Sequence, residues 1–336
     1  MAKKLLVTSS PHLRSGETTT TVMGDVLIAL LPALVVSVVF FGFRALGLCL
    51  VSVACAMAME TLFNLICKRP NTVADLSSAV TGLLLAFCVP VTTPYWMICI
   101  GDFFAIVIVK MLFGGIGKNF FNPALAARAF LFSWPAVMTT FVEPFSSHLI
   151  SIFGGTAAQQ AQIDAITTAT VLSELKNQGQ SPDSLISLFL GNQAGCLGEV
   201  SAAMLLLGGV YLLCRKVITW HIPVSYIGTV ALITFLFPKT GGMFDLKYMG
   251  IQILSGGLML GAIFMATDYT TSPITKKGKI IYGVGCGVLT VFLRYFSGYP
   301  EGVSYAILLM NTLAFTLDKK TMPKRYGTGG AADDIG

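Results

Sequence analysis

The sequence has 336 residues, of which 54% are hydrophobic and only 11% are charged, and its formal net charge at pH 7 is +6. Soluble domains contain about 25% charged residues, so this composition excludes a protein whose whole surface faces water. The positive charge is carried by short segments between apolar runs, so it gives no support to nucleic-acid binding.

Residues 1–20 are the first predicted segment. Lys3 and Lys4 are followed by a polar stretch rich in serine and threonine, without the apolar core and small-residue cleavage site of a signal peptide. We therefore expect residues 1–20 to form a cytoplasmic tail.

Long apolar runs follow this tail. The run DVLIALLPALVVSVVFFGF, which begins at Asp25, has the roughly 20 residues needed to cross the hydrocarbon core of a bilayer. Hydropathy predicts about ten such helices, and therefore a multi-pass protein of the inner or plasma membrane. They cover residues 22–42, 45–66, 73–90, 95–113, 123–141, 199–216, 221–237, 247–266, 280–296 and 302–317.

The basic residues indicate how these helices are oriented. With a cytoplasmic N-terminus, most lysines and arginines fall on the cytoplasmic side, as the positive-inside rule requires. The exceptions on the outer side are Arg44, Lys176, Lys239, Lys247 and Arg294. We therefore predict that both termini, including the tail 318–336, are cytoplasmic and that the segment 142–198 is external.

The two halves of the chain resemble each other. The first ends in KMLFGGIGKNFFNPALAARAF and the second in RYFSGYPEGVSYAILLMNTLAF. Residues 21–141 and 199–317 would each hold five helices, and because five is odd the second set must be inverted relative to the first. We predict an all-α polytopic membrane protein of two inverted five-helix repeats, an arrangement that builds sites near the midplane from broken helices. The alternative, that any two hydrophobic halves look alike, stays open.

Carboxylates inside the predicted helices are rare. Glu60 lies within the second helix, where a buried carboxylate costs about 2.5–3.5 kcal/mol, so it must face protein or water. One interpretation is an ion pathway, by cation handling or proton relay, and the other is a buried hydrogen bond to a neighbouring helix. For acids nearer the helix ends we expect capping or interfacial solvation. These are Asp25, Asp75, Asp102, Glu199 and Asp268.

Two polar tracts on the cytoplasmic side are candidates for a binding pocket. GKNFFNPALAAR supplies the amides of Asn119 and Asn122 and the guanidinium of Arg128, which needs an anionic or carbonyl partner. ATDYTTSPITKKG supplies Asp268 from the second half. The alternative is that both tracts are ordinary helix starts and stops.

Other kinds of site are not indicated. The eight cysteines form no CxxC pair and there are only three histidines, so we expect no metal site built by this chain alone. The sequence also shows no phosphate-binding glycine loop and no arrangement of nucleophile, histidine and acid. We therefore predict no catalytic side chain.

The external segment contains a small polar tract, DAITTATVL. Its members Asp164, Thr167, Ala169, Thr170 and Leu172 match the flavin-attachment motif of one family. This chain has Thr168 where that motif usually has glycine. The chain resembles this family, which contains the D-type components of Rnf complexes and the B-type components of sodium-translocating NADH:quinone reductases. The resemblance extends to GKNFFNPALAARAFLF, GNQAGCLGE and MATDYTTSP, and the short N-terminal tail favours the Rnf type.

The resemblance implies two flavins. Thr170 would carry FMN through a phosphodiester installed by a separate flavin transferase, and Asp164, Thr167, Thr168 and Ala169 would complete the attachment site. A non-covalent riboflavin would lie within the helices. Our candidate pocket for it consists of Asn119, Asn122, Arg128 and Asp268.

The resemblance also implies a function. The chain would be a membrane subunit of an ion-translocating complex of the ferredoxin:NAD oxidoreductase type, relaying electrons across the membrane coupled to Na⁺ or H⁺ transport. Its partners would be the FMN-bearing G-type subunit, the membrane A-type and E-type subunits, the flavin transferase and the lipid bilayer. The alternatives are a secondary transporter or channel with an inverted five-helix repeat and a structural anchor for redox partners.

Overall fold

The computed structural model describes residues 17–142, 144–145, 167–168, 170–178, 185–191, 193–199, 201–239, 244–297 and 301–323. Most of these residues are helical, and one two-stranded sheet is present among them. Asp164 and Ala169 of the predicted attachment motif lie outside the described residues.

The first half begins with two long apolar helices. Their bounds and those of the elements that follow are α1 Thr19–Phe41, α2 Phe43–Ile66, η1 Val73–Asp75, α3 Ser77–Phe87, α4 Tyr95–Phe103, the π-helix η2 Phe104–Met111 and α5 Pro123–Leu131. The side chain of Thr18 caps α1 in a capping box with Thr21, so α1 starts near the first predicted boundary.

The second half contains a broken helix between longer ones. Its elements are α10 Ala202–Cys214, α11 His221–Leu236, α12 Leu246–Leu254, α13 Leu258–Leu260, the π-helix η5 Gly261–Met265, α14 Lys276–Phe296 and α15 Val303–Thr321. The chain bends by 64° between α12 and the segment formed by α13 and η5.

Helices lie in all ten predicted windows, but several are too short to cross a bilayer alone. Among the described residues, three helices are long and apolar enough to span, and the bent pair would be a fourth. α3 has 11 residues and α5 has nine, which gives lengths of about 16 and 14 Å, roughly half of the hydrocarbon thickness. Every residue of α3 is buried, so this helix faces protein on all sides.

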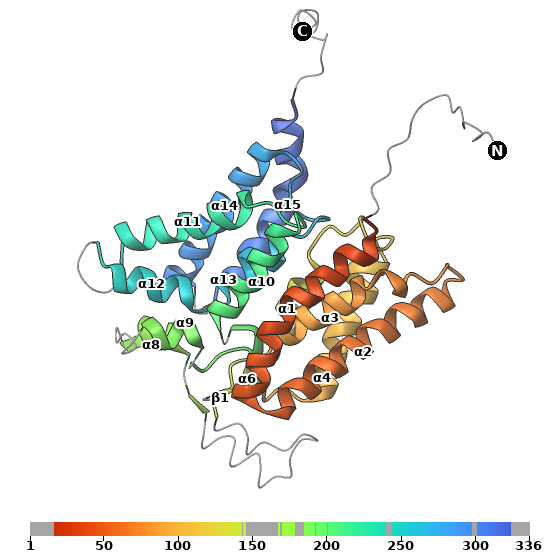
Figure 1. Ribbon diagram of the computed structural model, residues 1–336, viewed down its shortest axis with the longest axis horizontal. Coiled ribbons are helices and arrows are strands. Elements are labelled where there is room, and N and C mark those ends of the chain that lie inside the picture. Colours follow the sequence, from red (N-terminus) through yellow and green to blue (C-terminus); the bar gives the residue numbers. More distant parts are fainter. Residues whose placement is uncertain are drawn as a thin grey trace, which may run out of the picture.

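The segment between the halves contains short elements. They are α6 Pro135–Met138, β1 Phe141–Val142, β2 Thr167–Thr168, α8 Val171–Gln178, α9 Leu185–Leu190 and η4 Leu197–Glu199. β1 and β2 pair antiparallel, with Phe141 opposite Thr168. Figure 1 shows α6, β1, α8 and α9 at one side of the molecule, whereas α1 begins and α15 ends at the opposite side.

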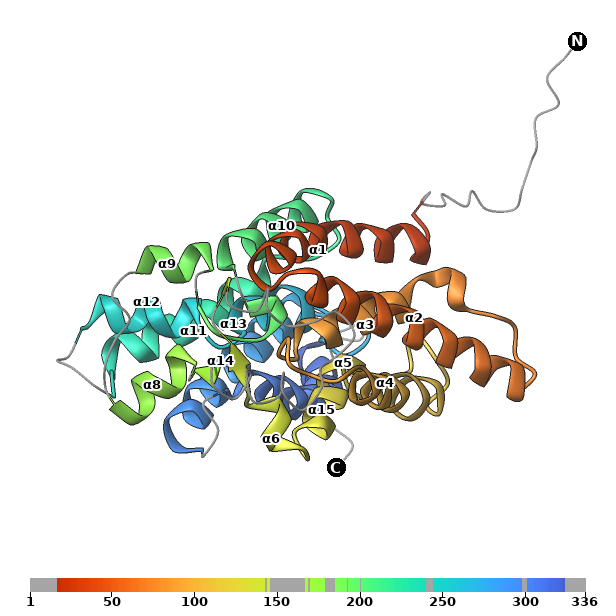
Figure 2. The ribbon, with the colours of Figure 1, turned by 90° about the horizontal axis from the view of Figure 1, so that it is seen from below.

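The two halves pack into one core. α1 lies alongside α10, and α5 contacts α15 (Figure 2). Gly208 of α10 makes the first contact close, because a Cβ atom there would lie 2.1 Å from the carbonyl oxygen of Ala29. Small residues allow this kind of approach between membrane helices. A single cluster of buried apolar side chains runs through both halves.

Two buried arginines hold the broken backbone. Arg44 Nε donates to Val91 O at 2.8 Å, in the break between α3 and α4. Arg294 Nη2 donates to Ser255 O at 3.0 Å and to Gly256 O at 3.3 Å, in the break between α12 and α13. Carbonyl groups without helical partners must be satisfied where water is excluded. Arg44 and Arg294, two of the basic residues that we predict on the outer side, therefore stabilise breaks between helices.

Candidate functional site

A polar cavity lies between the two halves, and we call it the inter-half cavity. It contains about 740 Å³ of empty space, part of which is open to the surface. The first half contributes α1, α3, η2 and the start of α5, and the second contributes the end of α10, η5 and the loop after it. Its polar lining residues are Ser77, Thr81, Lys110, Asn119, Asn122, Thr267, Asp268 and Thr270.

Asn122 stabilises the wall of this cavity at the start of α5. Its Oδ1 accepts the backbone N–H of Ala124 at 3.1 Å and so caps α5. Its Nδ2 donates to the carbonyl oxygen of Met265 at 3.2 Å, at the end of η5. Asn122 therefore links the two halves at the edge of the cavity.

Asn119 differs from Asn122 in its contacts. Its Oδ1 is buried, and no group of the described part of the chain donates a hydrogen bond to it. A buried acceptor without a donor costs free energy, and Asn119 lines the cavity. This oxygen is available to a ligand that brings an N–H or O–H group.

Asp268 lies in the loop after η5, on the wall of the cavity that the second half contributes. Its Oδ2 accepts the hydroxyl of Thr270 at 2.9 Å and that of Thr271 at 3.3 Å. Burial raises the pKa of Asp268 above its ordinary value, and these hydrogen bonds partly offset that rise. The carboxyl is therefore held in place as an acceptor at the cavity wall.

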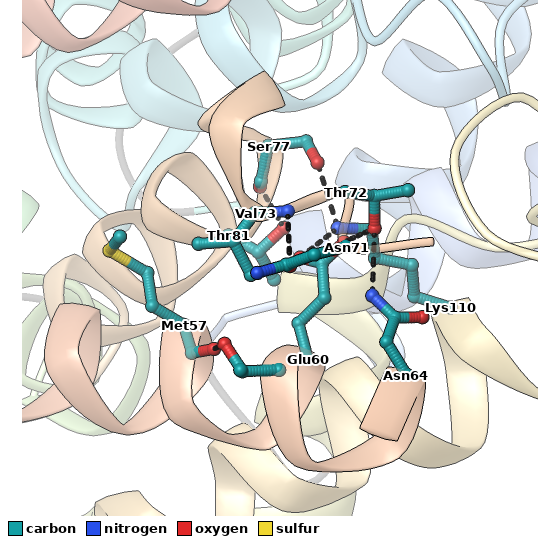
Figure 3. Close-up of polar contacts among 10 residues, drawn as sticks. Met57, Glu60, Asn64, Asn71, Thr72, Val73, Ser77, Thr81 and Lys110 are labelled. Carbon is teal, nitrogen blue, oxygen red and sulfur yellow. Dashed lines mark hydrogen bonds and ion pairs between the residues drawn. The ribbon is translucent and has the colours of Figure 1, made fainter. Parts of the chain in front are cut away.

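A buried ion pair, the Glu60–Lys110 pair, adjoins the cavity. Lys110 Nζ lies 2.9 Å from Glu60 Oε2 and donates to Ser77 Oγ at 2.8 Å. Thr72 donates to Glu60 Oε1 at 2.6 Å, and Asn64 donates to Thr72. Figure 3 shows these side chains converging from α2, η2 and the loop before α3. These contacts match the interpretation of Glu60 as a buried partner of a neighbouring helix, whereas ion transfer stays a prediction.

Lys110 is a site residue that sequence reasoning missed. It lies in the predicted helix 95–113, and its side chain is 2% exposed. Ionisable residues within membrane helices are rare and face protein or water, so this signal was present in the sequence. Glu60, with which Lys110 pairs, carries the same signal.

Arg128 does not line the cavity with the other three predicted residues. It lies six residues beyond Asn122, about 9 Å along the axis of α5. Its Nη2 lies 3.6 Å from Glu199 Oε1 and contacts Glu301 Oε2. We call Arg128, Glu199 and Glu301 the Arg128 triad, and all three side chains are at most 9% exposed.

The Arg128 triad also bears on metal binding. Ligand atoms of Cys196, Glu199 and Glu301 lie within 4.8 Å of one another, which is compatible with a metal ion by distance. The guanidinium of Arg128 already lies against both carboxylates and donates to Cys196 Sγ at 3.7 Å. It supplies the positive charge that a bound cation would bring, so these residues do not fit a cation well.

Thr170 lies at the start of α8 and is 6% exposed. Its Oγ1 accepts the backbone N–H of Ser173 at 3.4 Å, and its carbonyl accepts that of Glu174 at 3.0 Å. It faces a space of about 230 Å³, the Thr170 hollow. The other lining residues are Val171, Leu172, Gln193, Ala194, Glu199, Ser255, Gly256 and Glu301.

The acids at helix ends are more buried than the sequence suggests. Asp102 is 0% exposed, and its Oδ1 accepts the hydroxyl of Ser52 at 3.0 Å. Glu199 is 7% exposed. Asp25 accepts hydrogen bonds from Tyr211 and Arg215 of the second half. The expectation of interfacial solvation is therefore wrong for Asp102 and Glu199, because neighbouring helices cover them.

Comparison with known proteins identifies relatives along nearly the whole chain. The model of the NQR2, RnfD, RnfE family matches residues 6–327. One relative is the D component of the Na(+)-translocating ferredoxin:NAD(+) oxidoreductase complex of Acetobacterium woodii. The two chains are 45% identical over 327 residues, which cover 96% of this chain and 95% of that protein.

Two further relatives carry related names. The chain is 42% identical over 332 residues to the D component of the proton-translocating ferredoxin:NAD(+) oxidoreductase complex of Clostridium ljungdahlii, covering 96% of each chain. It is 37% identical over 344 residues to the D component of the ion-translocating oxidoreductase complex of Vibrio cholerae, covering 96% of this chain and 99% of the relative.

Proposed function

Since the chain belongs to the NQR2, RnfD, RnfE family, we propose that it is the D component of an ion-translocating ferredoxin:NAD⁺ oxidoreductase complex. The observation that carries this proposal is the likeness over nearly full length to proteins of that name. It favours a redox role over the solute transporter and the structural anchor. The coupling ion stays undecided, because one relative is named for Na⁺ and the other for protons.

The membrane arrangement is part of the proposal. Ten helices, several of them half-length, would form two inverted repeats, with both termini in the cytoplasm and Thr170 outside. The start of α1 and the end of α15 lie at the side opposite α8, which supports this orientation (Figure 1). The partners would be the G-type, A-type and E-type subunits of the complex, together with the flavin transferase.

We propose that Thr170 carries FMN through its hydroxyl. The start of α8 suits a phosphodiester, because N–H groups and the helix dipole favour negative charge at such a position, and the N–H of Ser173 points to Thr170 Oγ1. Glu199 and Glu301 also face the Thr170 hollow, and Arg128 offsets one of their two charges. The phosphate would thus face one net negative charge rather than two.

The inter-half cavity is our candidate for a second, non-covalent flavin such as riboflavin. Ligand cavities usually combine apolar walls with a few fixed polar groups, and the inter-half cavity has such a lining. Asn119 Oδ1 would accept an N–H of the ring, and Asn122 would keep its cross-half bond. Apolar neighbours such as Val26 and Phe264 would exclude water.

A flavin supplies one-electron or two-electron chemistry, and the residues of this chain hold and insulate it. The inter-half cavity and the Thr170 hollow share no lining residue. An elementary charge that crosses the membrane potential gains or loses about 2.3 kcal/mol per 100 mV. Electron transfer between two such positions would therefore respond to the membrane potential, as a coupled ion pump requires.

Substitution of Thr170 by valine tests the covalent site. The full-length variant is made in cells that contain the flavin transferase, with Thr139→Val, an exposed threonine outside the attachment motif, as the matched control. Both are compared with wild type on a denaturing gel. We expect flavin fluorescence in the wild-type and control bands and none in the Thr170→Val band. A fluorescent Thr170→Val band would disprove the assignment, and a non-fluorescent wild type would favour the transporter or anchor.

A further inference from the structure

A basic hollow lies between the start of α14 and the end of α15, and we call it the lysine hollow. It contains about 950 Å³ of space open to the surface. It lies at the side of the molecule where α15 ends, which is the predicted cytoplasmic side (Figure 1). Its lining residues are Thr275, Lys276, Lys277, Lys320, Thr321, Met322 and Pro323.

The three lysines of this hollow are not used in ion pairs within the described part of the chain. The neighbouring acid, Asp318, is occupied by backbone groups. It accepts the N–H of Ile274 at 3.0 Å and that of Thr275 at 3.2 Å. Asp318 therefore fixes the loop before α14 against α15, and its single negative charge leaves the three lysines in excess.

Two of the lysines lie where the helix dipole opposes them. Lys276 and Lys277 are the first two residues of α14, and a helix N-terminus carries partial positive charge that disfavours cations and favours anions. Lys320 lies in the last turn of α15, where the partial negative charge of the helix C-terminus favours a cation. An anion in the hollow would offset the charges of the lysines and the partial positive charge at the N-terminus of α14.

The surroundings of the hollow indicate the source of that anion. The hydroxyls of Thr275 and Thr321 contact each other and join the two helices. Beyond them, large apolar side chains are exposed on both helices, including Ile281 at 48% and Phe315 at 76%. A basic hollow above an apolar helix surface matches a phosphate headgroup with its acyl chains below.

We propose that the lysine hollow binds the phosphate headgroup of an anionic phospholipid from the leaflet that surrounds α14 and α15. Lys276, Lys277 and Lys320 contact the phosphate, and the acyl chains follow the exposed apolar faces of the two helices. This site is separate from both flavin positions and stands whether or not the chain carries flavin. Its occupant is a lipid rather than an acidic protein or a free phosphate, because the two helices that form the hollow also expose large apolar side chains.

The experiment uses the purified full-length chain and native mass spectrometry. The protein is titrated with phosphatidylglycerol and, separately, with phosphatidylcholine of the same acyl chains. Wild type should bind phosphatidylglycerol preferentially. The Lys276→Gln/Lys277→Gln/Lys320→Gln variant should lose about fivefold in affinity for each lysine removed, the equivalent of about 1 kcal/mol per lysine near an anionic surface.

A matched control removes three charges from other loops on the same predicted side. Lys68, Arg69 and Lys118 are exposed and do not line the lysine hollow, so their triple glutamine variant should bind phosphatidylglycerol like wild type. A triple arginine variant of the hollow should also retain binding, which shows that the glutamine effect is loss of charge and not misfolding.

Three outcomes would overturn the proposal. Equal loss in the control variant would indicate diffuse attraction by the whole basic face. Unchanged affinity in the glutamine variant of the hollow would show that these lysines do not contact the lipid. Displacement of phosphatidylglycerol by glycerol 3-phosphate at similar concentration would show a site for a soluble phosphate.

Discussion

The Glu60–Lys110 pair and the Arg128 triad are both buried charge clusters, but they differ in what surrounds them. In the first, one amine faces one carboxylate, and the hydroxyls of Thr72 and Ser77 bind them. Lys110 and Ser77 also line the inter-half cavity of about 740 Å³. In the second, one guanidinium lies between two carboxylates beside a hollow of about 230 Å³. The first adjoins a cavity between the two halves, whereas the second joins three segments of the chain beside the Thr170 hollow.

The segments joined by the Arg128 triad lie far apart in sequence. Arg128 belongs to α5, Glu199 ends η4 and Glu301 precedes α15. Guanidinium groups suit this task because several N–H donors in one plane bind more than one acceptor. The comparison teaches that buried charge in this protein serves two purposes: the Glu60–Lys110 pair adjoins a cavity, and the Arg128 triad joins distant segments. Substitutions at the two clusters should separate the purposes.

The largest effect should follow from Arg128→Met. Removing the guanidinium leaves two carboxylates side by side without a counter-charge, and breaking a buried pair costs about 3–5 kcal/mol. We expect a loss at the upper end of this range, measured as the free energy of unfolding in detergent. An Arg128→Met/Glu301→Gln variant should recover part of it. If Arg128→Met unfolds like wild type, the triad does not hold the segments together.

Lys110→Met should cost less, about 3 kcal/mol, because one carboxylate remains and Thr72 still donates to it. The double variant Glu60→Gln/Lys110→Met should be more stable than Lys110→Met alone, since no buried charge is left. A double-mutant cycle on thermal unfolding measures this coupling. Additive losses would mean that the two side chains do not interact. Loss of non-covalent flavin in the stable double variant would connect the pair to the cavity.

Asn122→Ala and Asn119→Ala should separate a structural amide from a ligand-binding one. Asn122→Ala removes the cap of α5 and should lower the unfolding free energy by about 1 kcal/mol. Asn119→Ala should change stability by less than about 0.5 kcal/mol but reduce the flavin extracted by acid from the purified protein. The reverse pattern would show that Asn119 does not bind the flavin.

The smallest effect should be a pH dependence at Asp268. Its pKa in the folded protein is raised by burial above 3.8, so the ionised form opposes folding. Its favourable contribution is present at low pH and is lost as the pH rises through the folded-state pKa. Asp268→Asn should therefore gain stability relative to wild type as the pH is raised from about 4. Thermal unfolding of both proteins at several pH values measures this gain. A constant difference would show that Asp268 titrates normally.

The sequence predicts the helical class and ten windows that each contain a helix, because apolar runs are long and interrupted by polar turns, but it does not predict α8 and α9. It did not predict that α3 and α5 would be half-length, since a buried half-helix and a spanning helix have the same apolar composition. The polar tracts correctly brought Asn119, Asn122 and Asp268 to one cavity. Arg128 was misplaced because its direction depends on the rotation of α5, and its partners Glu199 and Glu301 are distant in sequence.

The hydrogen bond from Asn122 to Met265 has a consequence for motion. It ties the start of α5 to η5, and the ion pair from Arg128 to Glu301 ties α5 to the residues before α15. Alternating-access transporters work by rocking one repeat against the other, and such rocking would break both buried links here. With the two proposed flavins in place, these links would instead keep the distance between them constant, which electron tunnelling needs.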